Sequence, residues 1–242
     1  MIRIISITAS FFLAGYLFFV SFLFAEKRPE KACEEIMIAV KDSLNKHFVN
    51  ERDILDLLKR ADMNPLHKPM NHINTESIEK ELMNNQMIAN VEVYKTPSGK
   101  IKLEIEQKLP ILRVISGGGS YYVDNKGSAM PVSSRYVAHV PVASGNIEKE
   151  LALNDLYKFA LFLQDNDFWN SQIGQIYVRS DSEVELIPTV GNHRIVLGTL
   201  DEFEEKLDNL QLFYKQAIPK IGWEKYGIIN LKYKDQIVCT KK

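Results

Sequence analysis

The sequence contains little cysteine and no excess of charge of either sign. Its two cysteines, Cys33 and Cys239, exclude a framework of several disulfides; we interpret them as free thiols, although one bridge between them is not excluded. Lysine and arginine together number 30, and aspartate and glutamate 31, so the formal net charge is −1. Acidic and basic residues are interspersed without a basic stripe, and we therefore expect no nucleic-acid partner.

Motifs for catalysis, cofactors and metals are also missing. The glycine-rich residues 117–120 are followed by Tyr122 where a dinucleotide-binding loop needs its third glycine, so we interpret them as a flexible joint. His67 and His72 are five positions apart, a spacing that does not place both rings on one helix face for zinc. Residues 124–127 lack the alternating acids of a calcium loop and indicate a hairpin turn. We predict no catalytic residue, no cofactor, no metal site and no small-molecule substrate.

One long apolar run is present, and it lies at the start of the chain. The 22 residues from Ile4 to Ala25 carry no charge. As a helix they would reach ~33 Å, enough for the ~30 Å hydrocarbon core of a bilayer. A cleaved signal peptide would have a shorter apolar region that ends at small residues, but Leu23 lies two positions before Ala25. We predict a single uncleaved transmembrane helix over residues 4–25.

The charges that flank this run do not decide its orientation. Arg3 precedes it, whereas Lys27, Arg28 and Lys31 follow it. Taken alone, the positive-inside rule would keep the rest of the chain in the cytoplasm. Large domains, however, are translocated largely regardless of flanking charge.

The first part of the remaining chain predicts a compact mixed unit. Alternating apolar residues predict a strand at 36–40, and Asn50 and Asn74 are the expected caps of two helices, the first ending at residues 64–65. Residues 89–94 and 101–105 alternate on either side of a turn at 96–99 and predict a hairpin with one polar face. The predicted order is β-α-α-β-β.

The second part, beyond residue 108, predicts short strands with frequent turns and two helices. One helix spans residues 150–165, and the other begins at a capping box formed by Thr199 and Glu202 and ends near Pro219. The whole chain is therefore predicted to be α+β, with strand-rich structure in its second part. The predicted strands are residues 111–115, 121–123, 173–178, 183–187, 193–197 and 228–238.

The β-α-α-β-β order after the apolar run resembles the POTRA domain, the polypeptide-transport-associated fold. The chain as a whole is similar to the bacterial cell-division family FtsQ/DivIB, and the similarity covers nearly its whole length. The stretches that carry it are the apolar run, the POTRA-like residues 32–106, Glu106-Gln107-Lys108-Leu109-Pro110, Tyr121-Tyr122-Val123-Asp124 with Gly127 and Pro131, and Ile229-Asn230-Leu231-Lys232-Tyr233.

The resemblance implies a domain organisation and a location. Residues 1–3 would be a cytoplasmic stub, shorter than the cytoplasmic tail of the family, and residues 4–25 the anchor in the bacterial cytoplasmic (inner) membrane. A linker, 26–31, would lead to a POTRA-like domain, 32–108, and a C-terminal β-rich domain, 109–242. The bulk of the chain would be extracytoplasmic, or periplasmic, and present at the division site.

The resemblance also implies a function without catalysis. The chain would be a membrane-anchored scaffold that recruits and links division proteins resembling FtsB and FtsL, including DivIC-type proteins, during septum formation. One alternative is a POTRA-containing component of polypeptide translocation or outer-membrane assembly, although such proteins usually carry POTRA units in series. A membrane-anchored hydrolase is a third alternative, for which the sequence offers no catalytic site.

The partner-binding surface is predicted at the closing strand, residues 228–238. This strand ends the chain, so no later strand need cover its edge, and lysines protrude from its polar face as they do on edges that must not self-associate. The resemblance implies that FtsB binds there by strand addition. Ile229, Leu231 and Tyr233 would face the core; a solvated edge without a partner is the alternative. The predicted contact residues are Ile228, Asn230, Lys232, Lys234, Gln236 and Val238.

Overall fold

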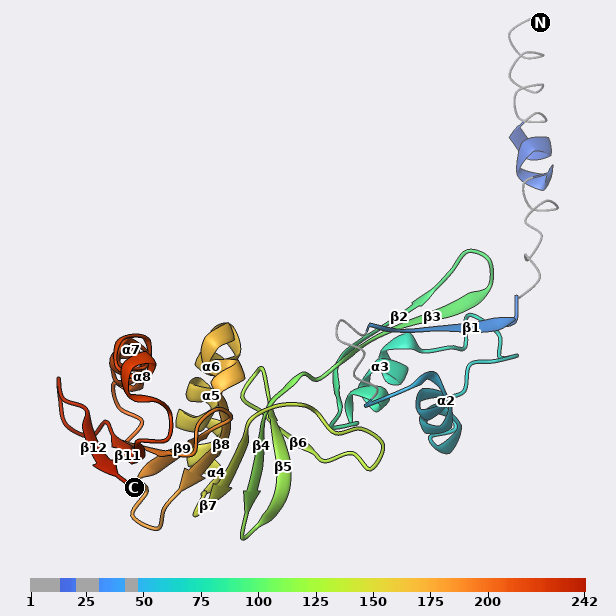
Figure 1. Cartoon of the computed structure of the whole chain (residues 1–242). Helices are drawn as coiled ribbons and strands as arrows, with labels where there is room; N and C mark the ends of the chain where they lie inside the picture. Colours follow the sequence, from blue (N-terminus) through green and yellow to red (C-terminus); the bar gives the residue numbers. More distant parts are fainter. Residues whose placement is uncertain (1–13, 21–30, 42–47) are drawn as a thin grey trace, which may run out of the picture.

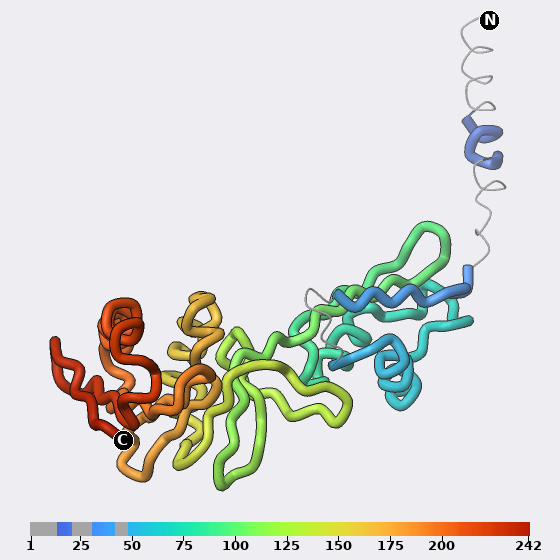
Figure 2. Tube along the Cα trace, viewed as in Figure 1, coloured from blue at the N-terminus to red at the C-terminus, as the bar shows by residue number. Residues whose placement is uncertain are grey.

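The structure is a computed structural model that describes residues 14–20, 31–41 and 48–242. Two lobes lie end to end and give the molecule an elongated shape (Figure 1, Figure 2). A three-stranded sheet forms the N-terminal lobe, and a nine-stranded sheet the C-terminal lobe. Most of the predicted transmembrane segment, including Ile4 and Ala25, lies outside the described residues, and residues 14–20 form a helix. Within the described ranges, no helix combines the length and apolar character needed to cross a membrane.

The N-terminal lobe confirms the predicted β-α-α-β-β order. Strand β3 lies in the centre of the sheet, with β1 parallel to it and β2 antiparallel. Both helices lie on the same side of the sheet (Figure 1). The elements are β1 (Glu35–Lys41), α2 (Glu51–Arg60), α3 (Thr75–Met83), β2 (Ile88–Lys95) and β3 (Lys100–Gln107).

Local sequence signals explain this lobe. The Asn50 side chain accepts a hydrogen bond from the Asp53 amide at 3.0 Å, and the Asp53 carboxylate accepts one from the Asn50 amide at 3.1 Å, which forms a capping box at the start of α2. Asn74 likewise caps α3. Helix α2 ends at Arg60, before the predicted stop at 64–65, because Asp62 adopts a left-handed conformation with φ of 55°.

The C-terminal lobe is one sheet in the order β12-β11-β10-β9-β8-β7-β4-β5-β6. Its strands are β4 (Pro110–Ser116), β5 (Gly119–Asp124), β6 (Ala129–Pro131), β7 (Val142–Gly145), β8 (Ile173–Val178), β9 (Val184–Pro188), β10 (Arg194–Gly198), β11 (Tyr226–Asn230) and β12 (Val238–Lys241). Its helices are α4 (Lys149–Leu153), α5 (Asp155–Asp165), α6 (Asp167–Gln172), α7 (Phe203–Gln216) and α8 (Ile218–Ile221).

The helices of this lobe cover one face of its sheet. On that face a row of paired residues crosses the strands from β4 to β11, and every member is buried. Burying such a row against helices is the main source of stability in a two-layer α/β arrangement. The members of the row are Val114, Ala143, Ile176, Leu186, Ile195 and Ile229.

Three predictions about the C-terminal lobe are wrong in detail. The glycines at 117–119 are not a flexible joint: Gly117 and Gly118 form the turn of the β4–β5 hairpin, and Gly119 begins β5, where it pairs with Ser116. The helix predicted over 150–165 is interrupted at Asn154, whose φ and ψ of −116° and −82° are not helical. Glu202 precedes α7 in a left-handed conformation and makes no side-chain capping bond, so the predicted capping box does not form.

Candidate partner-binding edge

The closing segment is not the single strand that alternation predicted. Strand β11 ends at Asn230 and β12 begins at Val238, and the two strands pair antiparallel. The Leu231 amide still donates to the carbonyl of Val196 at 2.9 Å, but the Asn230 side chain then accepts from the Lys232 amide at 3.0 Å. This local bond satisfies a backbone donor outside the sheet, and the chain turns back through residues 231–237.

The predicted contact residues therefore lie in three different places. Ile228 and Asn230 are in β11, which has β10 on one side and β12 on the other, so they are not at an edge. Val238 is in the edge strand β12, and its side chain is 44% exposed. The remaining three residues, Lys232, Lys234 and Gln236, are exposed in the connecting loop 231–237.

The predicted inward residues are confirmed only in part. Ile229 and Leu231 are buried, as expected for the core face of a strand. Tyr233 is 55% exposed, because it follows the point at which the chain leaves the sheet. An aromatic ring is therefore available on the loop beside β12, and sequence alternation had placed it in the core.

The side chain of Lys232 is already engaged in an ion pair within the molecule. Its Nζ forms an ion pair with Oε1 of Glu183, on the turn between β8 and β9, and this hydrogen bond raises the pKa of the ammonium group. Gly198 lies beneath it with φ of 77°, and a Cβ there would come within 2.8 Å of Lys232 Cγ. Lys232 thus holds the loop against the sheet, whereas Lys234 makes no ion pair with any described residue.

One edge of the nine-stranded sheet is β12 and the other is β6; alternation alone does not identify β12 as an edge. Its one paired neighbour among the described strands is β11, so the backbone groups on its other side are not used in the sheet. Such a row of N–H and C=O groups is a template for an added strand. Val238, Thr240 and Lys241 are exposed along it. A hairpin could have been predicted here, because the polar residues 234–236 are typical of a turn and the following residues 238–240 are typical of a strand.

A small hollow lies between the start of α7 and the loop 231–237. Its volume of about 70 Å³ is well below the range of about 300–1,000 Å³ that is typical of small-molecule sites. Polar and charged side chains from both elements form most of its lining, including Glu202, Lys206 and Asp235. The features near the edge therefore suit a polypeptide partner better than a small ligand.

Comparisons with known proteins agree with this architecture. The family described as "FtsQ/DivIB, C-terminal related" matches residues 109–240, and the POTRA-like domain family matches residues 31–106. A cell division protein FtsQ from Rhodothermus marinus is 26% identical over 165 residues, which is 62% of this chain and 59% of that protein. The chain thus matches about three fifths of this relative's length. Because the C-terminal family match covers more than half of the sequence, the chain belongs to the FtsQ/DivIB family of bacterial cell-division proteins.

Proposed function

We propose that this protein is a non-enzymatic, membrane-anchored scaffold of the divisome. It would recruit and link partners resembling FtsB and FtsL outside the cytoplasmic membrane during septum formation. Family membership supports a role in cell division, and the comparisons do not favour a role in polypeptide translocation or outer-membrane assembly. The observation that carries the scaffold proposal is the open edge of β12 at one end of the nine-stranded sheet.

The domain organisation belongs to the same proposal. Residues 4–25 would anchor the chain, 32–108 would form the POTRA-like domain, and 109–242 the partner-binding domain. In Figure 1, β12 lies at the end of the molecule opposite to β1. A partner at β12 would therefore bind far from the point at which the chain leaves the proposed anchor.

Strand addition at β12 fits the exposed groups. Backbone hydrogen bonds would supply affinity, and side chains that alternate along the added strand would supply selectivity. Val238 and Thr240 are exposed, whereas Cys239 between them packs against the C-terminal core. Tyr233 and Lys234 on the adjoining loop would offer an aromatic and a cationic contact beyond the strand.

Hydrogen exchange with the purified FtsB–FtsL pair of the same organism tests this proposal. We expect residues 238–241 to become protected in the complex. Val238→Lys should weaken binding about tenfold or more, about 1.4 kcal/mol, because a lysine on an edge strand opposes strand addition. Val190→Lys is the matched control, since Val190 is also an exposed valine but lies in the β9–β10 turn.

Two results would exclude binding at β12. One is a complex in which residues 238–241 exchange as fast as in the free protein. The other is an equal loss of affinity in both lysine variants, which would indicate a general effect of the added charge. Circular dichroism of both variants verifies that the fold is retained.

A further inference from the structure

The two lobes share a hydrophobic core. The core cluster of the N-terminal lobe includes three buried residues that belong to the C-terminal lobe: Tyr122 of β5, Met130 of β6 and Ala138 of the loop after β6. Each of these side chains is at least nine-tenths buried. Hydrophobic burial across the joint therefore opposes its opening.

The loop at residues 132–141, which joins β6 to β7, crosses this joint. It runs from the C-terminal lobe towards α2 of the N-terminal lobe (Figure 1). Phe48 packs edge-on against Tyr136 of the loop and Tyr122, with ring centroids 4.8 and 6.1 Å away. The Ala138 amide donates to the Tyr122 hydroxyl at 3.2 Å. The loop is thus held by apolar contacts to one lobe and by a hydrogen bond to the other.

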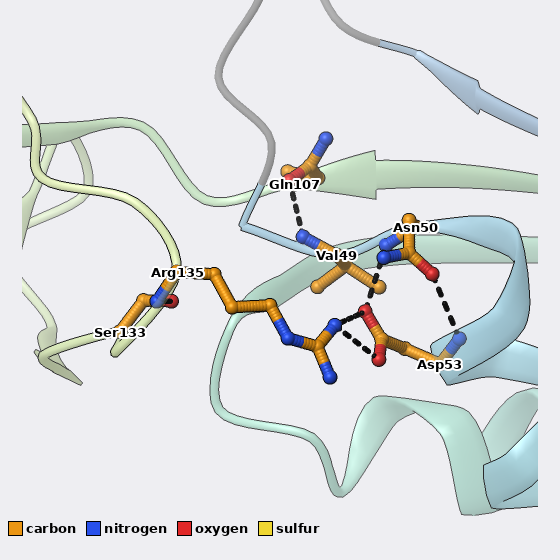
Figure 3. A network of polar contacts seen from close by, with 6 residues as sticks. All are labelled: Val49, Asn50, Asp53, Gln107, Ser133 and Arg135. Carbon is orange, nitrogen blue, oxygen red and sulfur yellow. Dashed lines mark hydrogen bonds and ion pairs between the residues drawn. The ribbon is translucent and has the colours of Figure 1, made fainter.

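An ion pair joins the loop to the start of α2. Arg135 Nη1 lies 2.6 and 2.7 Å from the two carboxylate oxygens of Asp53 (Figure 3). Asp53 is fixed because it also accepts the Asn50 amide in the capping box. On the other side of this turn, the Val49 amide donates to Oε1 of Gln107, which is buried at the end of β3 (Figure 3). The Asp53 carboxylate, which accepts the hydrogen bonds from Arg135, therefore has a defined position in the N-terminal lobe.

The contacts divide into two kinds with different consequences. The side chains of Arg135 and Asp53 are 62% and 24% exposed, so their attraction is screened and modest. The buried aromatic contacts supply most of the adhesion, but ring packing tolerates small rotations. The two hydrogen bonds from Nη1 to the carboxylate oxygens depend more strongly on direction, because a hydrogen bond weakens steeply as it bends. Adhesion and orientation are thus supplied by different residues.

We propose that residues 132–141 are a strap that holds the two lobes as one rigid body, and that the Arg135–Asp53 ion pair sets the angle between them. The strap would hold β12 at a constant position relative to the N-terminal lobe. This inference does not depend on which partner binds β12, because it concerns the free protein.

A distance measurement across the joint tests the strap. Glu76→Cys on α3 and Asp208→Cys on α7 place spin labels at exposed sites in different lobes of the full chain. Cys239→Ser removes the partly exposed native thiol, and Cys33 remains because it is fully buried. Pulsed electron paramagnetic resonance should give one narrow distance distribution for this parent protein.

Two substitutions should change that distribution. Arg135→Glu places a carboxylate beside Asp53 and should broaden or displace it. Asp53→Asn should broaden it less, because an amide oxygen can still accept the Asn50 amide while the charge is lost. Asp56→Asn is the matched control, since Asp56 is an exposed residue of the same helix that does not contact Arg135. Circular dichroism should show the same helix content in all three variants.

The inference has clear contrary outcomes. A broad distribution in the parent protein would overturn the rigid joint. A narrow, unshifted distribution in Arg135→Glu would show that the aromatic contacts set the angle without the ion pair. An equal change in Asp56→Asn would attribute the effect to loss of helix charge and not to the strap.

Discussion

Among single residues, His193 is a polar group that the C-terminal lobe buries with few polar contacts. Its side chain is buried, and Nε2 lies 2.6 Å from the Tyr214 hydroxyl. Its ring is nearly parallel to that of Trp223, with an interplanar angle of 16°. Nδ1 has no hydrogen-bond partner among the described residues. Gly191, with φ of 91°, lies so close that a Cβ there would come within 2.7 Å of Nδ1, so this contact requires glycine.

The environment of His193 predicts a pH-dependent stability. Burial and, secondarily, the charge of Lys242 lower the pKa of His193 below its ordinary value of 6.5, and Glu224 opposes this shift. As the pH falls below about 6.5, the unfolded chain takes up a proton that the folded protein does not. The contribution of His193 to stability is therefore present above this pH and is lost progressively as the pH falls towards the folded pKa.

Urea unfolding between pH 8 and pH 5 measures this effect. We expect the free energy of unfolding to decrease less over this interval in His193→Gln than in the unsubstituted protein. His139→Gln is the control, because His139 is exposed in the loop 132–141. An identical pH dependence in the protein with and without His193 would contradict the prediction.

At the level of elements, sequence patterns predicted the helices and strands correctly where hydrogen bonds between neighbouring residues decide the structure. The caps of α2 and α3 and the alternation of β2 and β3 are visible in neighbouring residues, and the structure confirms them. The POTRA-like lobe was therefore predictable. The parallel pairing of β1 with β3 is not visible in such local patterns, because strand order depends on contacts between distant residues.

The predicted partner-binding site depends on contacts that alternation does not reveal. Ile229, Leu231 and Tyr233 continue one alternating pattern, although the chain leaves the sheet between the second and third of these residues. The bonds that accompany the turn involve Val196 and Glu183, which are distant in sequence. The sequence predicted one closing edge strand, but residues 228–238 belong to a hairpin, and its second strand, β12, is the edge.

The Lys232–Glu183 ion pair leads to a prediction about the loop 231–237. Lys232→Ala should increase hydrogen exchange in this loop, because its tie to the β8–β9 turn is lost. Lys234→Ala is the matched control and should leave exchange unchanged. The charge-swapped pair Lys232→Glu with Glu183→Lys should recover part of the protection. Equal exchange in both alanine variants would show that other contacts hold the loop.

At the scale of the whole molecule, the boundary between the lobes does not separate two independent cores. The family matches change near residue 108, and so does the strand pattern. Nevertheless Tyr122 and Met130, which follow this point, are buried in the core cluster of the N-terminal lobe. Each lobe is therefore expected to be more stable in the full chain than alone, because separation would expose apolar surface on both sides.

Tyr122 allows this coupling to be measured. In the full chain its ring is 1% exposed and contacts Phe48 of the other lobe, so Tyr122→Ala should destabilise the protein by about 2–5 kcal/mol. In residues 109–242 expressed alone, the contact with Phe48 is absent, and the same substitution should cost much less.

Leu163→Ala is the control. Leu163 lies in α5 and its contacts are within the core of the C-terminal lobe, so this substitution should cost about 2–5 kcal/mol in both the full chain and the fragment. Denaturant unfolding of the four variants and their two parents gives the comparison. If Tyr122→Ala costs the same in the fragment as in the full chain, the ring is stabilised within its own lobe, and the shared core does not couple the two lobes.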